Sequence, residues 1–219
     1  MLEQILLELA LSKTKLIAVS KTKPNEAIMN LYNHGQRRFG ENYVQEIEDK
    51  QATLPTDIEW HFIGHLQSNK VKYIAPFVHT IHSVDSFRLL SEINKQGAKN
   101  ERVIRVLLQF HIAEEETKFG FDTEGVKEMM NGMTPTSWAN IEICGVMGMA
   151  TFTENKVQVR REFQHLKSIF DELKQTYFTD SQHFNEISMG MSDDYLMAIE
   201  EGSTMVRIGS LLFGKRDYV

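Results

Sequence analysis

Two lysines stand at the end of an apolar segment near the start of the chain. Residues 16–24 read LIAVSKTKP, so Lys21 and Lys23 directly follow residues that are typical of a buried strand. A lysine whose stem leaves a buried strand end can have its ammonium partly desolvated, which lowers the pKa and makes the amine nucleophilic. The alternative, from this segment alone, is that both lysines extend from a loop into solvent.

Two other segments combine small and hydroxyl residues where strands are predicted to end. They read ISMGMSDD (187–194) and RIGSLLFG (207–214). Backbone N–H groups and hydroxyls in such turns can bind a phosphate, helped by the dipole of a helix that begins there. Taken singly, each segment is more simply an ordinary turn, so the arrangement of the strands decides between the two interpretations.

The elements that must position these residues alternate between strand and helix along the chain. Short β-rich runs occupy residues 16–20, 37–41, 59–64, 79–84, 103–110, 141–149, 184–190 and 205–209. Helical patterns occupy 26–35, 42–50, 86–97, 125–132, 159–178 and 193–202, several of them closed by a glycine stop signal at Gly35, Gly97, Gly132 or Gly202.

This alternation predicts an α/β fold, a single (β/α)8 TIM-type barrel that forms one domain over residues 1–219. The chain is compact beside the ~250 residues typical of such barrels. A doubly wound sheet is the competing fold, and it would need a glycine-rich turn after an early strand. The segment after residue 20 has no such turn.

Barrel topology brings the chemically interesting segments together. Active sites of such barrels lie at the carboxyl ends of the strands, and phosphates favour the loops after strands seven and eight. Lys21 ends the first strand, which neighbours the eighth once the barrel closes. A lysine amine beside a phosphate site is the usual requirement for pyridoxal 5'-phosphate, which we expect as the cofactor.

Arg207 has a predicted place in the same pocket. Alternation in the last strand puts Met205, Arg207 and Gly209 on one face, which we take as the barrel interior. Because arginine only donates hydrogen bonds, Arg207 against a pyridine nitrogen would keep that nitrogen unprotonated and weaken the cofactor as an electron sink. The alternative is an arginine in a surface salt bridge.

Six ordered motifs between Leu16 and Gly214 resemble the pyridoxal phosphate homeostasis protein family. They are AVSKTKP (18–24), FGENYVQE (39–46), WHFIGHLQSNK (60–70), EETKFGF (115–121), SMGMSDD (188–194) and VRIGSLLFG (206–214). The resemblance implies an alanine-racemase-like barrel without that enzyme's second β domain. The segment before Leu16 is shorter than the helix usual in this family, which leaves open how that face of the barrel is covered.

The resemblance also implies the roles of individual residues. Pyridoxal phosphate would be held as a Schiff base on Lys21, with Arg207 at the pyridine nitrogen and Asn42 beside the ring. The phosphate contacts would fall on Ser188, Gly209 and Ser210, and the accessory lysines at the mouth would be Lys23 and Lys118.

By this resemblance the protein carries or buffers pyridoxal phosphate and maintains its intracellular (vitamin B6) homeostasis, with apo-enzymes as candidate recipients. The alternative is a pyridoxal-phosphate enzyme such as a weak amino-acid racemase. A racemase needs two bases on opposite faces of the substrate carbon. In alanine racemase one of them is a tyrosine from the second domain of a paired subunit, and no motif here supplies it. We therefore expect a non-catalytic, monomeric binding protein.

Composition narrows the setting of this function. A formal net charge of −6 argues against nucleic-acid or anionic-membrane partners, which need a basic face. The single cysteine, Cys144, excludes an internal disulfide and fits a reducing, cytoplasmic compartment. His61 and His65 are four residues apart but flank an extended segment, so we predict no metal site.

Overall fold

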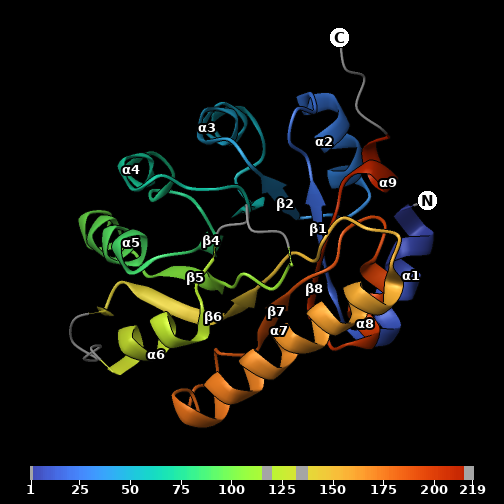
Figure 1. Ribbon diagram of the computed structural model, residues 1–219. Helices are drawn as coiled ribbons and strands as arrows, with labels where there is room; N and C mark the ends of the chain where they lie inside the picture. Colours follow the sequence, from blue (N-terminus) through green and yellow to red (C-terminus); the bar gives the residue numbers. More distant parts are fainter. Residues whose placement is uncertain (1, 115–119, 132–137, 215–219) are drawn as a thin grey trace.

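The fold is a closed barrel of parallel strands in a computed structural model that describes residues 2–114, 120–131 and 138–214. Within these residues the strands pair in chain order, and β1 closes the barrel against β8 (Figure 1). They are β1 (Lys15–Val19), β2 (Arg38–Glu41), β3 (Glu59–Phe62), β4 (Thr80–Val84), β5 (Ile104–Gln109), β6 (Ile141–Met147), β7 (Glu186–Ser188) and β8 (Met205–Ile208). The predicted (β/α)8 barrel is confirmed, and each predicted strand is present.

Helices surround the barrel (Figure 1). They are α1 (Leu2–Ser12), α2 (Asn25–Asn33), α3 (Val44–Thr53), α4 (Val71–Ile74), α5 (Phe87–Lys99), α6 (Thr123–Asn131), α7 (Lys156–Thr176), α8 (Tyr195–Glu200) and α9 (Ser210–Phe213), with the 3₁₀ helix η1 at Ser68–Lys70. The sequence patterns missed η1, α4 and α9 because one helical turn is too short to show an apolar period. None of the described helices has the length and apolar character needed to cross a membrane.

The glycine stop signals were only partly correct. Gly35 and Gly202 have positive φ angles of 93° and 94° at the ends of α2 and α8, as predicted. Gly97 instead lies inside α5, where a Cβ atom would come within 2.6 Å of the Asn140 carbonyl oxygen. That glycine therefore serves the close approach of two segments and ends no helix. Gly132 lies outside the described residues.

The first helix covers the outer face of the strands that close the barrel. Ile5 and Leu9 of α1 pack against Leu16, Val206 and Ile208. The short α1 is therefore sufficient to bury the outer face of β1 and β8.

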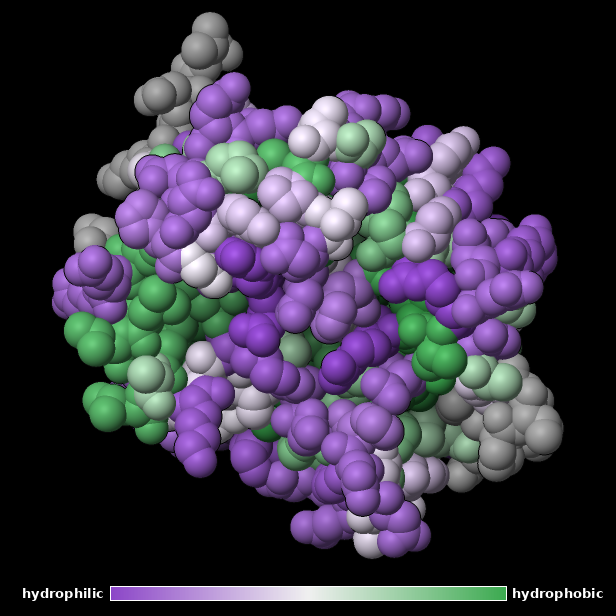
Figure 2. Space-filling model, turned by 180° about the vertical axis from the view of Figure 1, so that it is seen from behind, coloured by the Kyte–Doolittle hydropathy of each residue, from purple (hydrophilic) through white to green (hydrophobic). Residues whose placement is uncertain are grey.

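On the opposite side of α1, apolar side chains face solvent. In the rear view of Figure 2 hydrophobic residues gather at the left edge, over α1, where Leu7 and Leu11 are 70% and 91% exposed.

The interior of the barrel is apolar where β1, β5, β6 and β8 line it and polar beside β3 and β4. Its apolar side chains are those of Ile17, Leu107, Cys144, Met147 and Met205. Arg207 lies opposite Ile17 in the register of β8 and β1 and is buried, whereas its neighbours Val206 and Ile208 pack under α1. The predicted alternation of the last strand is therefore confirmed.

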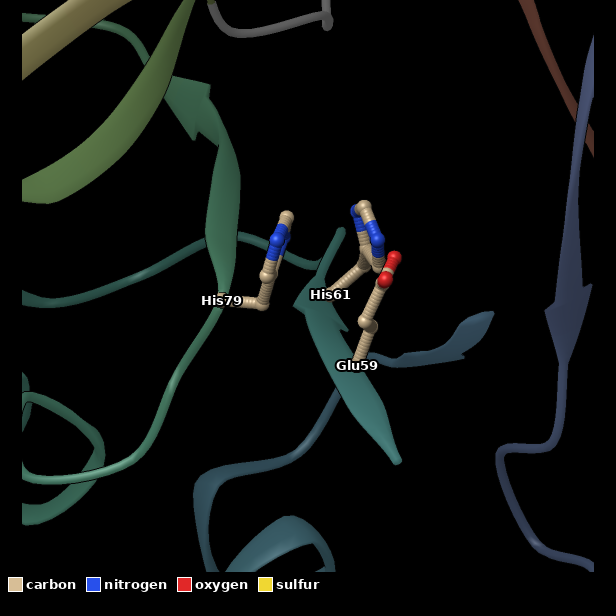
Figure 3. A group of neighbouring side chains, drawn as sticks. All are labelled: Glu59, His61 and His79. Carbon is tan, nitrogen blue, oxygen red and sulfur yellow. The ribbon is translucent and has the colours of Figure 1, made fainter. Parts of the chain in front are cut away.

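The polar part of the interior is built from histidines. The ring nitrogens Nδ1 of His61 and Nε2 of His82 are 2.8 Å apart, and both rings are buried. Figure 3 shows His61 with Glu59 and His79, whose potential ligand atoms lie within 4.8 Å of one another. Arg38 Nε is 2.9 Å from the Glu59 carboxylate, so this carboxylate is already paired with an arginine.

Two further observations bear on metal binding. Burial is the main cause of the lowered pKa of His61, and the positive charges of Arg38 and Arg105 add to it. The same charges would oppose a divalent ion. His65 Nδ1 lies 3.2 Å from the Asp85 carboxylate, whereas His61 lies in the barrel. We therefore assign no metal to these side chains.

The buried histidines predict that the protein loses stability in mild acid. Burial lowers the pKa of His61 and His82 well below the usual value, so they stay neutral when folded and take up protons on unfolding. Stability should therefore be full above about pH 6.5 and fall below it, by up to about 1.4 kcal/mol per pH unit for each group.

Urea unfolding at pH 7.5 and pH 5.5 checks this prediction. The unfolding free energy should fall between pH 7.5 and pH 5.5, and in His82→Asn this fall should be smaller than in the parent by about 1.4 kcal/mol. The control His165→Asn, at an exposed position on α7, should leave it unchanged. Equal pH dependence in parent and His82→Asn would contradict the assignment.

Candidate functional site

Lys21 lies in a tight turn directly after β1, at the carboxyl end of the barrel. The Lys23 N–H closes this turn by donating to the Ser20 carbonyl at 3.0 Å, and Thr22 has a positive φ of 62°. Lys21 is half-buried. The Lys23 ammonium donates to the carbonyl of Phe213 at 3.1 Å, which directs it to the last residue of α9.

Barrel closure places the predicted glycine-serine turn beside this segment. Gly209 follows β8, and a Cβ atom on it would lie 3.3 Å from both Cβ and the carbonyl oxygen of Val19, the last residue of β1. Gly209 thus packs against the strand that leads into Lys21. Ser210 is exposed at the start of α9.

Ser192 joins this cluster, and sequence reasoning missed it. The Gly209 N–H donates to Ser192 Oγ at 3.3 Å, so the loops after β7 and β8 meet through this pair. Ser192 belongs to the SMGMSDD motif, where the hydroxyl and glycine content was the available signal. Which of its two serines lies beside Gly209 depends on how the loop folds back.

Ser188, the other serine of that motif, lies deeper in the barrel. It is the last residue of β7 and is buried, with its Oγ 2.6 Å from Arg207 Nη1 and 3.0 Å from His82 Nδ1. Its hydroxyl therefore links the arginine to the histidine-lined interior.

Arg207 is held entirely by oxygen atoms at the ends of β6 and β7. Besides the Ser188 hydroxyl, its guanidinium donates to the carbonyl of Ser188 at 2.8 Å and to that of Gly148 at 3.0 Å. Burial lowers its pKa to about 10, which leaves it charged at neutral pH, and the nearby Asp194 carboxylate opposes that shift. The guanidinium is a fixed positive charge inside the carboxyl end of the barrel.

Asn42 lies after β2, the strand next to β1. Its Oδ1 is buried and has no hydrogen-bond partner among the described residues, and its backbone is so close to Gly64 that a Cβ atom there would be 2.4 Å from the Asn42 carbonyl. Asn42 also lines a cavity of about 470 Å³ with Phe62 and His65. That cavity includes neither Lys21 nor Arg207, so among the predicted site residues it contains Asn42 alone.

A buried charge network lies under the Lys21 turn. Lys50 of α3 is 5% exposed, and its ammonium donates to Glu41 and Glu46 and to the backbone of Ser20. Sequence reasoning missed this lysine because a glutamate four residues before it is typical of an exposed helical ion pair. Lys118 lies outside the described residues.

The arrangement can bind an anionic aromatic aldehyde. One end offers the lysine amine of the β1 turn, and the adjacent β7 and β8 loops offer an N–H and hydroxyls from Gly209, Ser192 and Ser210. Arg207 adds a buried guanidinium group, which can donate hydrogen bonds and cannot accept them.

Comparison with known proteins gives this geometry a context. The alanine racemase N-terminal domain family matches residues 4–217. A pyridoxal phosphate homeostasis protein of Aquifex aeolicus is 44% identical over 205 residues, covering 93% of this chain and 88% of that protein. The structure of PipY from Synechococcus elongatus with pyridoxal phosphate bound is similar at a TM-score of 0.83 and 34% identity, covering 92% of this chain and 93% of that one.

Alanine racemase itself is a more distant likeness. The enzyme from Bartonella henselae is 15% identical with a TM-score of 0.71, covering 93% of this chain and 56% of that one, and shows the fold alone. The family match and the high identity to the Aquifex protein are much more specific. The chain therefore belongs to the alanine racemase N-terminal domain family and, within it, to the pyridoxal phosphate homeostasis proteins, as its motifs predicted.

Proposed function

We propose that this protein binds pyridoxal 5'-phosphate and carries or buffers it, so that the cofactor reaches apo-enzymes that need it. The observation that carries the proposal is the meeting of the Lys21 turn with Gly209 at the closure of β1 and β8. The names of its relatives and the pyridoxal phosphate in PipY support it.

The residues present fit this cofactor. The amine of Lys21 would bond covalently to the aldehyde carbon with loss of water, and Arg207 would donate toward the ring nitrogen. Asn42 would lie beside the ring, where its buried Oδ1 still lacks a partner among the described residues. The phosphate would contact Gly209 and Ser210. Ser188, also predicted as a phosphate contact, is instead hydrogen-bonded to Arg207 and His82 deeper in the barrel, where the ring nitrogen would lie. We add Ser192, because its hydroxyl already accepts from the Gly209 N–H.

A carrier is a better interpretation of this site than an enzyme. Bound pyridoxal phosphate supplies an electron sink, which is weak when its ring nitrogen stays neutral. Arg207 is charged, buried and can only donate, so it would keep the nitrogen neutral. A weak amino-acid racemase remains the second candidate, because its fold is shared with alanine racemase. Exchange of the amino-acid α-proton, abolished in Lys21→Ala, would favour that enzyme.

We also propose that the protein acts in the cytoplasm as a monomer with one domain over residues 1–219. Its lone cysteine, Cys144, is buried and forms no disulfide, which suits a reducing compartment. A stable interface buries about 1,200–2,000 Å². The exposed leucines of α1 occupy one face of a three-turn helix, which is small for that purpose.

Light scattering at micromolar concentration should give the mass of a single chain. Leu7→Glu and Leu11→Glu should leave that mass unchanged, because they alter only the exposed patch of α1. A stable dimer of the parent would refute the monomer, and its loss in these variants would locate the interface on α1.

Lys21 is predicted to be the covalently modified residue. Borohydride reduction of the loaded protein, followed by peptide mass mapping, should place the cofactor on Lys21. Lys21→Ala should lose the fixed label there while retaining some noncovalent binding through Arg207 and the phosphate contacts. Label mainly on Lys23 or Lys118 with Lys21 intact would contradict the assignment.

Arg207→Glu should change cofactor affinity and chemistry together. A carboxylate can accept from a protonated ring nitrogen, so α-deuterium exchange of an added amino acid should rise. The same carboxylate opposes the phosphate charge, and we expect retention to fall at least about tenfold, which needs only about 1.4 kcal/mol. The loss of affinity should be the larger effect.

Cofactor dissociation and deuterium exchange are measured on the same preparation, after circular dichroism shows that it is folded. Arg161→Glu is the matched control, because it reverses a charge at an exposed position of α7. If Arg207→Glu is not folded, Arg207→Gln replaces it. Parent-like values of both quantities would show that Arg207 does not face the ring.

A further inference from the structure

A buried ammonium group holds together the elements around the Lys21 turn. Lys50 Nζ donates to the Ser20 carbonyl at 2.8 Å, to Glu41 Oε1 at 2.8 Å and to Glu46 Oε1 at 2.6 Å. An ammonium has three N–H donors, so these acceptors use all of them. They come from the residue after β1, the end of β2 and the first turn of α3. One side chain thus connects three segments at the carboxyl end of the barrel.

The two carboxylates extend this network to both sides of Lys21. Glu41 Oε1 accepts from the hydroxyl of Ser20, the residue before Lys21. Glu46 Oε1 accepts from the backbone N–H of Thr22, the residue after it. The carbonyl, hydroxyl and amide that flank Lys21 are therefore all bonded to the same three side chains.

The backbone of this turn requires such support. Thr22 is β-branched and has a φ of 62°, a conformation that such residues rarely adopt. Strained residues of this kind persist when the surrounding structure holds them, and they cluster at functional sites. The Ser20 carbonyl and the Thr22 N–H belong to the two peptide groups that flank Lys21, so holding both of them fixes where the Lys21 side chain leaves the backbone.

The burial of this network indicates a role other than stability. Glu41 is 0% exposed, and burial raises the pKa of its carboxyl group, against the attraction of Lys50. Buried ion pairs can often be replaced by apolar residues without loss of stability, so their presence favours a demand for a defined geometry. In this protein the geometry that the network defines is that of the Lys21 turn.

We propose that Lys50, with Glu41 and Glu46, forms a positioning network that selects Lys21 over Lys23 as the amine that binds an aldehyde ligand. This inference rests on the proposed function, because it presumes that a lysine of this turn binds pyridoxal phosphate. Lys23 is the natural competitor: it is half-buried, two residues away, and held by a single hydrogen bond to Phe213 in place of a buried network.

The test compares where the cofactor is fixed in three variants. Lys50→Met removes all three donors and keeps a stem of similar length. Lys50→Arg keeps the charge, but its planar fork does not reproduce three diverging donors. Lys167→Met is the control, because it removes a lysine that pairs with Asp171 on the surface of α7. Each protein is loaded with substoichiometric pyridoxal phosphate, reduced with borohydride and mapped by peptide mass.

The parent and Lys167→Met should carry nearly all of the label on Lys21. In Lys50→Met the ratio of Lys21 to Lys23 label should fall about tenfold or more, since small misplacements of a reacting group have effects of that size. Lys50→Arg should give an intermediate ratio. Hydrogen exchange of the cofactor-free Lys50→Met protein should be faster at the Thr22 and Lys23 amides and unchanged in β4 and β5.

The possible failures are distinguishable. A parent that fixes no cofactor on either lysine would refute the proposed function. A parent labelled on Lys21 together with an unchanged ratio in folded Lys50→Met would overturn the positioning role alone. Should Lys50→Met not fold, Glu46→Ala replaces it, because Glu46 is only half-buried and still bonds both Lys50 and Thr22.

Discussion

The parallel pairing of β1 with β8 is the contact on which the site depends. The two strands are far apart in the sequence, and their register sets Ile17 opposite Arg207 and Ala18 opposite Ile208. That register brings Gly209 against Val19, where a Cβ atom would lie in a tight contact of 3.3 Å with the neighbouring strand. Closure therefore brings the Lys21 turn and Gly209 together, while α1 buries the outer face of the same two strands.

A second constraint is that Arg207 has donors and no acceptor. The Ser188 hydroxyl accepts from Arg207, which leaves its own proton for His82 Nδ1. His82 Nε2–H then donates to His61 Nδ1, and the remaining His61 Nε2–H is buried with no hydrogen-bond partner among the described residues. Arg207 thus sets the tautomers of two buried histidines, and the hydrogen bonds of the polar interior hold the Arg207 guanidinium in place.

The two lysine-bearing regions of the site differ in how they are held. The Lys21 turn is hydrogen-bonded to the buried network of Lys50 and two glutamates, whereas the Lys23 ammonium donates to the last residue of α9. Arg207 is braced by backbone carbonyls of β6 and β7. Groups held at rigid strand ends keep a constant geometry, so this barrel can hold the Lys21 turn and the Arg207 cation in fixed places.

The sequence by itself determined the strands, the barrel and the segments of the site. Alternating apolar runs define elements locally, and the motifs around Lys21 and Arg207 are contiguous in the chain, so neither requires knowledge of distant contacts. Only the tertiary structure decided which groups meet. Ser192 rather than Ser188 lies beside Gly209, Gly97 serves packing rather than a helix end, and Lys50 is buried under Lys21. The physical reason is that hydrogen-bond partners and burial depend on how segments distant in sequence fold back on one another, and composition and spacing carry little of that information.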